Sequence, residues 1–335
     1  MAKKNTIYDV AKKAGVAIST VSRVLNESPY VSEETKSKVV NAIKDLEFRP
    51  QVNARLLAKR QPQIIAVAVP TFTTPFFNEV LKGVKDEIKA LNLDFIIYNT
   101  GSENPEGQFI SFIDRGVPDA LIMFSIEITD EIYKGIKDLS IPIILVGAEH
   151  SDFDSISWNN YRGGFLAAEH LISCDYKKIG MIRSHKSSYI ADQREKGFKD
   201  AMKKYKIPID ENCIVSGITT KHAGFSEEAG FEAVNILNKR NNIPQALFCS
   251  NDAQAIGALH ALNELGKRVP EDVAVMGYDN IKVSRYFNLT TIDQKMYEVG
   301  VQAIKLLSHR IKNKEDRVHH SIIEPELIIR KSTTR

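Results

Sequence analysis

The chain has 335 residues, of which 43% are hydrophobic and 26% are charged, with a formal net charge of +3 at neutral pH. This composition is typical of globular proteins, and the length fits roughly two or three domains. No apolar run approaches the roughly 18 residues of a membrane span, and the lysine-containing N-terminus lacks the apolar stretch of a secretion signal, so we expect a cytoplasmic protein. The cysteines are few and widely spaced, so we expect reduced thiols and neither a disulfide nor a metal site at Cys174, Cys213 and Cys249.

The charge is unevenly distributed along the chain. Residues 1–60 contain 12 lysines and arginines but 6 aspartates and glutamates, a local net charge of +6. The remaining residues contain 33 basic and 36 acidic side chains, a local net charge of −3. A basic head on a slightly acidic body favours a polyanionic partner for the head alone.

The head is predicted to form three short helices. Thr6 and Ser32 are suitable N-caps for the first and the third, and Gly15 supplies a residue without a side chain where the first helix ends. The apolar residues at helical spacing are, helix by helix, Ile7, Val10, Ala11 and Ala14; Val21, Val24 and Leu25; and Val39, Ala42, Ile43 and Leu46. Two short helices across a glycine turn, followed by a third, are typical of a helix-turn-helix unit.

The second of these helices, in ISTVSRVLN (residues 18–26), presents short polar side chains away from its apolar face: Ser19, Thr20, Ser22, Arg23 and Asn26. A solvated face would more often carry Glu and Lys four residues apart. Hydroxyls, amides and an arginine can instead reach phosphates and base edges from a helix in the DNA major groove. The pattern therefore favours DNA recognition by this helix.

The segments TIYDVAKKAGVAISTVSRVLN and VSEETKSKVVNAIKDLEFRPQVNARLLA resemble the head of the LacI–GalR family of bacterial transcription regulators. The resemblance implies that Ile18 and Ser19 read bases, with a thymine methyl as the natural partner of Ile18, and that Arg23 contacts a base or a phosphate. Ala17 departs from the family, which usually has a serine before this helix. The residues expected to contact DNA are Thr6, Ile18, Ser19, Thr20, Ser22, Arg23, Asn26, Arg55 and Leu57.

Residues 49–61 form a basic segment that contains Arg49, Arg55, Lys59 and Arg60. A charged linker is one interpretation of this segment. The resemblance implies instead a hinge helix that forms on DNA, in which Leu57 wedges between base steps in the minor groove. Because such leucines act in pairs, the resemblance also implies a homodimer on double-stranded operator DNA with approximate two-fold symmetry.

From residue 62 onward, short apolar runs alternate with amphipathic helical stretches. The runs form two series, IIAVAVP, DFIIYNT, DALIMFS and PIILVGA, then KIGMIRS, CIVSGI, ALFCSN and VAVMGYD. This pattern predicts an α/β body of two doubly wound parallel-sheet lobes, preceded by the small all-α helix-turn-helix domain. The body also resembles periplasmic sugar-binding proteins, which implies that the chain crosses between lobes near Asn160, Thr290 and Ser321. The expected domains are residues 1–48 (helix-turn-helix), 49–61 (hinge), 62–160 plus 290–320 (N-terminal lobe) and 161–289 plus 321–335 (C-terminal lobe).

In such a fold, ligands bind between the lobes at the carboxyl ends of the strands. The resemblance implies that Arg194, in ADQREKGFKDAM, binds the effector together with Asn251 and Asp279, each of which follows an apolar run. Phe76 and Phe77 stand where the family places aromatic rings against the ligand, and one of the two is expected to lie in the core.

Arg183, in MIRSHKSS, has two interpretations. In the first, Arg183, His185 and Lys186 form an anion site for a sugar acid or a sugar phosphate. In the second, all three residues lie in a solvated loop. A solvated loop is also the expectation for His319 and His320.

The chain has no GxGxxG after the first strand of the body, no Walker loop, no GxSxG and no HExxH. We therefore expect no enzyme activity, no cofactor and no metal. A DNA reader, a hinge and a ligand cleft in one chain predict an allosteric transcription regulator, a repressor, whose effector is a sugar or a sugar derivative. Whether the effector weakens or strengthens DNA binding stays open here.

Other functions share parts of this pattern. QKMYEVGVQAIKLL (residues 294–307) resembles the corresponding stretch of catabolite control proteins, which implies a phosphorylated phosphocarrier protein as corepressor. A solute-binding protein without a regulatory role would share the body but would not use the head. An architectural DNA-binding protein would share the head but would not need a ligand cleft.

Overall fold

The computed structural model describes residues 5–25, 28, 30–46, 48, 64–91, 93–101, 104–116, 118–184 and 189–334. The chain divides into two compact units, Met1–Gln63 and Ile64–Arg335. Several sequence-predicted positions lie outside the described residues: Asn26, the hinge segment 49–61 with Arg55 and Leu57, and His185 and Lys186. Among the helices that are described, none combines the length and apolar character needed to cross a bilayer.

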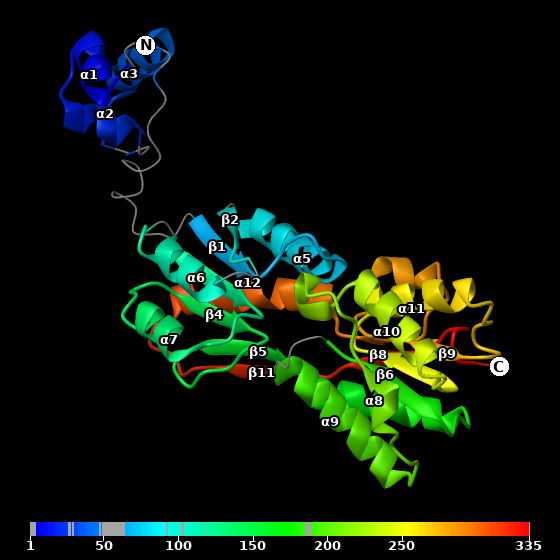
Figure 1. Cartoon of the computed structure of the whole chain (residues 1–335). Coiled ribbons are helices and arrows are strands. Elements are labelled where there is room, and N and C mark those ends of the chain that lie inside the picture. The colour runs from blue at the N-terminus through cyan, green and yellow to red at the C-terminus, as the bar shows by residue number, and fades with distance from the viewer. Residues whose placement is uncertain are drawn as a thin grey trace. The chain divides into compact units, whose positions relative to one another are not determined.

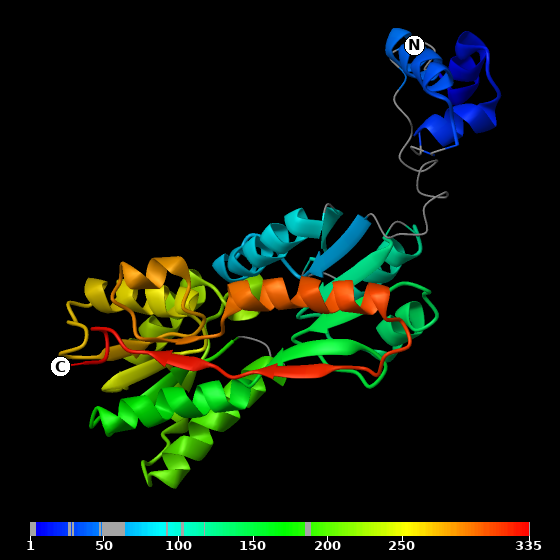
Figure 2. The same ribbon diagram turned by 180° about the vertical axis from the view of Figure 1, so that it is seen from behind.

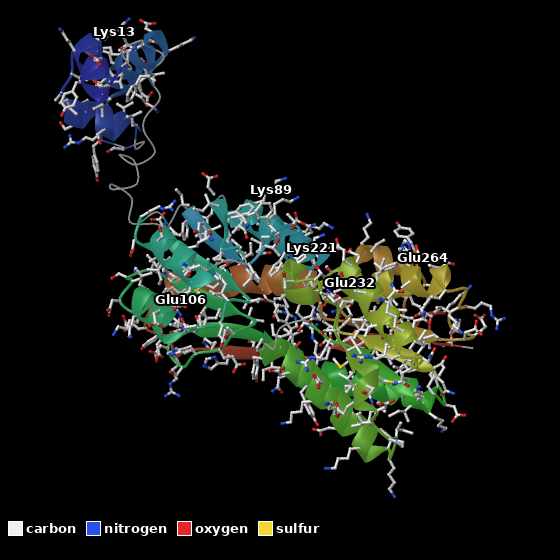
Figure 3. The ribbon with its side chains drawn as sticks, viewed as in Figure 1. Lys13, Lys89, Glu106, Lys221, Glu232 and Glu264 are labelled. Carbon is white, nitrogen blue, oxygen red and sulfur yellow. The ribbon has the colours of Figure 1, made fainter. Side chains whose placement is uncertain are left out.

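The first unit contains α1 (Ile7–Ala14), α2 (Ile18–Leu25) and α3 (Glu33–Asp45) (Figure 1). Their buried residues form one cluster, made of Val10, Ala11, Val21, Val24, Val39 and Ala42. On the surface, Lys13 of α1 (Figure 3) pairs with Asp45 of α3 at 3.0 Å. The three predicted helices and their inward faces are therefore confirmed.

The ends of these helices follow from local chemistry. Gly15 ends α1 with a φ of +66°, a conformation that costs glycine little, and its N–H donates to the Ala11 carbonyl. At the start of α1, the Thr6 N–H and hydroxyl both donate to the Asp9 carboxylate at 2.7 Å. The Ser32 hydroxyl accepts a hydrogen bond from the backbone of the first turn of α3.

The second unit, the body, contains two parallel sheets that define its two lobes. The sheet of the first lobe has the strand order β11-β5-β4-β3-β1-β2. Alternate residues of β1 face opposite sides, with Val67 packed against α5 and α12 and Ala66 packed against α6 and α7. The sheet is thus covered on both faces, as its continuous apolar runs predicted. The bounds are β1 (Ile64–Val69), β2 (Asp94–Asn99), β3 (Ala120–Phe124), β4 (Ile143–Val146), β5 (Asp154–Trp158), β11 (His320–Ile323), α5 (Pro75–Leu91), α6 (Pro105–Ile113), α7 (Asp130–Ile136) and α12 (Met296–Lys312).

The sheet of the second lobe has the order β7-β6-β8-β9. Helices α8 and α9 pack on one face and α10 and α11 on the other. A short antiparallel pair, β10 and β12, adjoins β9 through bridges at Met276 and Asp279. The bounds are β6 (Ile179–Ile182), β7 (Ile214–Val215), β8 (Ala246–Cys249), β9 (Ala274–Met276), β10 (Thr291–Asp293), β12 (Glu326–Ile328), α8 (Asn160–Ser173), α9 (Tyr189–Lys204), α10 (Glu227–Lys239) and α11 (Asp252–Glu264), with the 3₁₀ turns η1 (Glu211–Cys213), η2 (Lys221–Gly224) and η3 (Lys282–Arg285).

The chain passes between the lobes between β5 and α8, between β10 and α12, and between β11 and β12; Figure 2 shows the last stretch crossing from one lobe to the other. Two of these passages lie further along the chain than the sequence-based boundaries at Thr290 and Ser321. Ile292 of β10 lies in the core of the second lobe, and His320–Ile323 of β11 pairs with β5 of the first sheet. These strands have only three and four residues and are not apolar runs. Nothing in so short a strand indicates which sheet it joins, because that choice depends on distant hydrogen-bond partners.

Candidate functional site

In the head, five of the described residues predicted to contact DNA lie on α2, away from its core-facing side: Ile18, Ser19, Thr20, Ser22 and Arg23. Val21 and Val24 point into the core, whereas Ile18 is 41% exposed. Ser19 and Arg23 are exposed, Thr20 and Ser22 are half-buried, and Thr6 is exposed at the start of α1. An exposed β-branched side chain on a helix with an otherwise polar outer face is available for an apolar contact.

At the start of α2, Ala17 supplies the backbone part of an N-cap but no side-chain acceptor. The Ala17 carbonyl accepts hydrogen bonds from the N–H groups of Thr20 and Val21 at 2.9 and 3.2 Å. Ala17 has no hydroxyl with which to accept a further N–H of the first turn, so the departure from serine leaves a donor at this helix end available to another acceptor.

In the body, Arg194 lies at the junction of the two lobes and is 5% exposed. Its Nε donates to Asn160 Oδ1 at 2.9 Å, its Nη1 to the Ser250 carbonyl at 2.6 Å and its Nη2 to Gln294 Oε1 at 3.3 Å. The guanidinium also lies 3.7 Å from the centre of the Tyr278 ring. Asn160 and Gln294 belong to two of the passages between the lobes, and Ser250 and Tyr278 follow β8 and β9. Arg194 therefore contacts two interlobe passages and the carboxyl ends of two strands.

The position of Arg194 depends on a close approach of α8 and α9. A Cβ added at Gly164 of α8 would lie 2.0 Å from the Arg194 carbonyl oxygen, and one added at Gly197 of α9 would lie 2.0 Å from that of Tyr161. Glycine at both positions lets the two backbones touch, which brings the first turns of α9 against Asn160.

Asp279 is the second predicted residue in this network. It is 4% exposed and has a φ of +114°, a conformation that L-residues rarely adopt. Gln294 Nε2 donates to its carboxyl, so Gln294 bridges Arg194 and Asp279. Burial raises the pKa of Asp279 to about 8, although the Arg194 charge opposes the rise. The site therefore pairs an arginine with a carboxyl group that is readily protonated near neutral pH.

Asn251 is joined to its own lobe. Its side-chain oxygen accepts from the Gln254 N–H as the N-cap of α11, and its amide donates to the Phe225 carbonyl at 3.4 Å. The adjacent Asp252 is fully buried and accepts from the hydroxyls of Ser284 and Thr291 at 2.6 Å each. Both side chains thus fasten the carboxyl end of β8 to its neighbours.

Phe76 and Phe77 differ in environment, as expected. Phe77 is 7% exposed and belongs to the core of the first lobe. Phe76 is partly buried and packs edge-on against Trp158, with ring centroids 5.7 Å apart. Trp158 Nε1 in turn donates to the Gln294 carbonyl at 2.9 Å, which links Phe76 of the first lobe to the arginine network.

Arg183 pairs with two acids of α9, Glu195 at 2.9 Å and Asp192 at 3.8 Å. Its guanidinium therefore already has carboxylate partners within the chain. This geometry favours the loop interpretation of Arg183 over the anion site.

The structure adds site residues that the sequence did not single out for binding: Asn160, Trp158, Tyr278 and Gln294. Asn160 was used only to mark a passage between lobes, and Gln294 only as the start of a helix. A signal existed, because each of these residues lies at the carboxyl end of a strand or within two positions of it. Open α/β sheets bind ligands at these strand ends.

Comparisons with known proteins agree with this architecture. Residues 6–51 match the family of bacterial regulatory proteins described as lacI family, and residues 168–333 match a periplasmic binding protein-like domain. The HTH-type transcriptional repressor PurR of Haemophilus influenzae (strain PittEE) is 36% identical over 336 residues, which cover 98% of each chain.

Two solved structures extend the comparison. A complex of the transcriptional regulator CelR with cellobiose is 26% identical, with a TM-score of 0.72, over 98% of this chain and 100% of that one. A LacI family regulator from Enterococcus faecium with bound ribose is 29% identical, with a TM-score of 0.72, over 81% and 99%. With a matching head, a matching body and relatives that are repressors rather than enzymes, the chain belongs to the LacI family as a DNA-binding transcriptional repressor.

Proposed function

We propose that a sugar or sugar derivative binds between the two lobes of the body and changes the affinity of the head for an operator. The network around Arg194 carries the proposal, because it gathers hydrogen-bonding groups and an aromatic ring at a junction between the two lobes. Relatives whose structures contain cellobiose and ribose support a sugar as the ligand class. Because DNA is the target, we place this activity in the cytoplasm.

The chemistry of the network suits a polyhydroxyl ligand. A carboxyl group such as that of Asp279 can accept from two hydroxyls, and the Arg194 fork can donate to ring or hydroxyl oxygens. The Arg194–Gln294 hydrogen bond is the longest of the three that Arg194 makes, at 3.3 Å, so a ligand oxygen can replace it at small cost. The apolar face of a sugar ring would pack on Phe76, while Phe77 stays in the core. Asn251, which follows β8, would border the site on the side of the second lobe.

A neutral sugar fits this site better than an acid or a phosphate. The case for an anionic ligand depends on Arg183 as a second cation beside Arg194. Arg183, the cation considered for this role, already pairs with Glu195 and Asp192. We therefore propose a neutral sugar, with Arg183 outside the binding set.

Control of DNA binding follows from linkage between the two sites. Arg194 contacts residues at two interlobe passages, so a ligand that rearranges its hydrogen bonds changes the relative populations of lobe arrangements. A coupling free energy of about 1–3 kcal/mol would change operator affinity roughly 5–150-fold. In this proposal, residues 1–48 read DNA through Thr6, Ile18, Ser19, Thr20, Ser22, Arg23 and Asn26, residues 49–61 form the hinge through Arg55 and Leu57, and the body transmits the ligand signal.

The proposal includes a homodimer. The body has a surface groove of about 520 Å³ lined by α5, β2 and η3, including Leu81, Ile97 and Val283. Ile97 is 43% exposed, and Phe287 just beyond η3 is 47% exposed. Exposed apolar side chains at this groove suit an interface between two copies of the chain. Because both lobes line the groove, a change in the arrangement of the lobes would also change how the two copies are placed. Ile97→Glu should reduce the sedimentation coefficient of the full chain from dimer to monomer, and an unchanged value contradicts this interface.

Titration of the full chain with neutral sugars, sugar acids and sugar phosphates tests the ligand proposal. Trp158 is the single tryptophan and contacts Gln294, so its fluorescence should report binding. A ligand at 100 times its Kd should stabilise the body by about 2.7 kcal/mol and raise its melting temperature.

Two arginine variants make the titration specific. Arg194→Gln should abolish the response to the sugar that binds, whereas Arg183→Gln should leave it unchanged. Retained binding in Arg194→Gln contradicts the site. A response confined to acids or phosphates that is lost in Arg183→Gln contradicts the neutral-sugar proposal. The active ligand should also shift the affinity of the protein for DNA sequences selected by the protein itself.

A further inference from the structure

Two histidines and an aspartate meet where α12 ends and the chain returns into β11, a turn that can be followed in Figure 2. His309 lies in the last turn of α12, Asp316 in the connecting turn and His319 directly before β11. One ligand atom from each lies within 4.8 Å of the other two. His309 Nε2 and Asp316 Oδ2 are 2.9 Å apart, and the two imidazole centroids are 6.0 Å apart. All three side chains are exposed, so an ion can reach them from solvent.

The separations suit one coordination sphere. Zinc binds histidine nitrogen and carboxylate oxygen at about 2.0–2.2 Å, which in a tetrahedral site separates neighbouring ligand atoms by about 3.4 Å. The His309–Asp316 pair, at 2.9 Å, needs to open by only a few tenths of an ångström to admit an ion. No two of the three ligand atoms are more than 4.8 Å apart. A side-chain rotation is enough to bring atoms at this separation to coordination distance from one ion.

The backbone that carries two of the ligands is already fixed. Arg310 donates to the Asp316 carbonyl at 2.6 Å and to the Arg317 carbonyl at 2.9 Å. The same guanidinium makes a two-point pair with the buried Asp154 carboxylate, at 2.7 Å for each bond. Asp154 also accepts from the His319 N–H at 2.8 Å. Because these contacts hold the turn against α12, the three ligands need little ordering when an ion binds.

The donor set selects the class of cation. Two imidazole nitrogens and one carboxylate oxygen suit Zn²⁺ and other divalent ions of the later first transition row, whereas Mg²⁺ and Ca²⁺ prefer oxygen-only sites. Three protein ligands at the surface leave a coordination position for water. The thiols compete poorly, because burial raises the pKa of Cys213 to about 11 and also raises the pKa values of Cys174 and Cys249.

We propose that His309, Asp316 and His319 form a binding site for one Zn²⁺ or similar divalent transition-metal ion. The ion cross-links the end of α12 to the start of β11, and β11 leads into the third passage between the lobes. Binding therefore stabilises the folded first lobe, because the unfolded chain does not hold the three ligands together.

The test is calorimetric titration of the full, tag-free chain with ZnCl₂ after treatment with a chelator, paired with thermal unfolding. One Zn²⁺ should bind per chain and raise the melting temperature, NiCl₂ should act similarly, and MgCl₂ should have no effect. His319→Asn and Asp316→Asn should each weaken Zn²⁺ affinity at least about 10-fold. The matched control is His260→Gln, an exposed histidine on α11 that contacts Glu264 (Figure 3), which should bind zinc as the unaltered chain does.

Three outcomes overturn the proposal: no zinc binding by the unaltered chain, affinities within about twofold in both ligand variants, or an equal loss in His260→Gln. The metal-free variants should unfold at the temperature of the unaltered chain, because the exposed side chains support no core. His309→Gln replaces any ligand variant that fails to fold, and undiminished zinc affinity in this variant likewise overturns the proposal.

Discussion

Replacing Asp279 with asparagine should change how the stability of the body depends on pH. Asp279 is 4% exposed, and burial raises the pKa of its carboxyl to about 8 against the opposing charge of Arg194. In an unfolded chain the pKa of aspartate is about 3.9. Between these two values the folded protein keeps a proton that the unfolded chain releases. The free energy of unfolding contributed by Asp279 therefore falls as pH rises, and it stops falling above the folded-state pKa.

The size of the effect follows from the same shift. One pKa unit corresponds to about 1.4 kcal/mol, so ionisation of Asp279 lowers the free energy of unfolding by up to about 3 kcal/mol between pH 5 and 7.5. Asparagine is close to aspartic acid in size, is neutral throughout this range and can still accept from Gln294 Nε2. The stability of Asp279→Asn relative to the unaltered chain should therefore increase by up to about 3 kcal/mol from pH 5 to 7.5.

Urea denaturation of the full chain, followed by Trp158 fluorescence at several pH values, measures this difference. The indole is buried and donates to Gln294, so its signal reports unfolding of the body. An equivalent change at an exposed aspartate, Asp94→Asn on β2, provides the control and should give a profile parallel to that of the unaltered chain. A constant difference between Asp279→Asn and the unaltered chain across this pH range refutes the reasoning.

Three further predictions concern the hinge and the body. Leu57→Ala should weaken operator binding and leave sugar binding intact, because the proposed role of Leu57 is to separate base steps; equal DNA affinities would exclude the wedge. Arg55→Ala should reduce the slope of log affinity against log salt concentration by about 1, and an identical slope argues against a phosphate contact. Asp154→Asn should destabilise the body by about 3–5 kcal/mol in urea, since Arg310 loses a buried partner bound at 2.7 Å through two nitrogens. An unaltered urea midpoint is incompatible with that role of the pair.

The candidate site was only partly predictable from the sequence. Arg194 and Asp279 could be named because each belongs to a short, recognisable stretch of chain. The partners of Arg194 could not, since they lie 34, 56 and 100 positions away, at Asn160, Ser250 and Gln294. Nothing local in the sequence specifies such pairs, because they result from the packing of α8 against α9 and from the passage that follows β10.

The role of Arg183 also could not be decided from the sequence. Three polar residues after a strand allowed both an anion site and a solvated loop. The two carboxylates of α9 that pair with Arg183 distinguish these interpretations, and they become visible only when β6 and α9 are placed side by side. His319 was expected in a solvated loop, and its approach to His309 and Asp316 depends on how the turn after α12 folds back.

The sequence by itself determined the features that depend on neighbours a few positions apart. These are the three helices of the head with their caps at Thr6, Gly15 and Ser32, the outward face of α2, and the alternation of apolar strands with helices in the body. Helical and strand periodicity and capping are local, so one chain segment contains all the information they need. Only the tertiary structure decided the sheet that β11 joins, the residues that surround Arg194, the burial that perturbs Asp279 and the meeting of His309 with Asp316 and His319. Each of these is a contact between elements, set by packing and hydrogen bonds that no local pattern encodes.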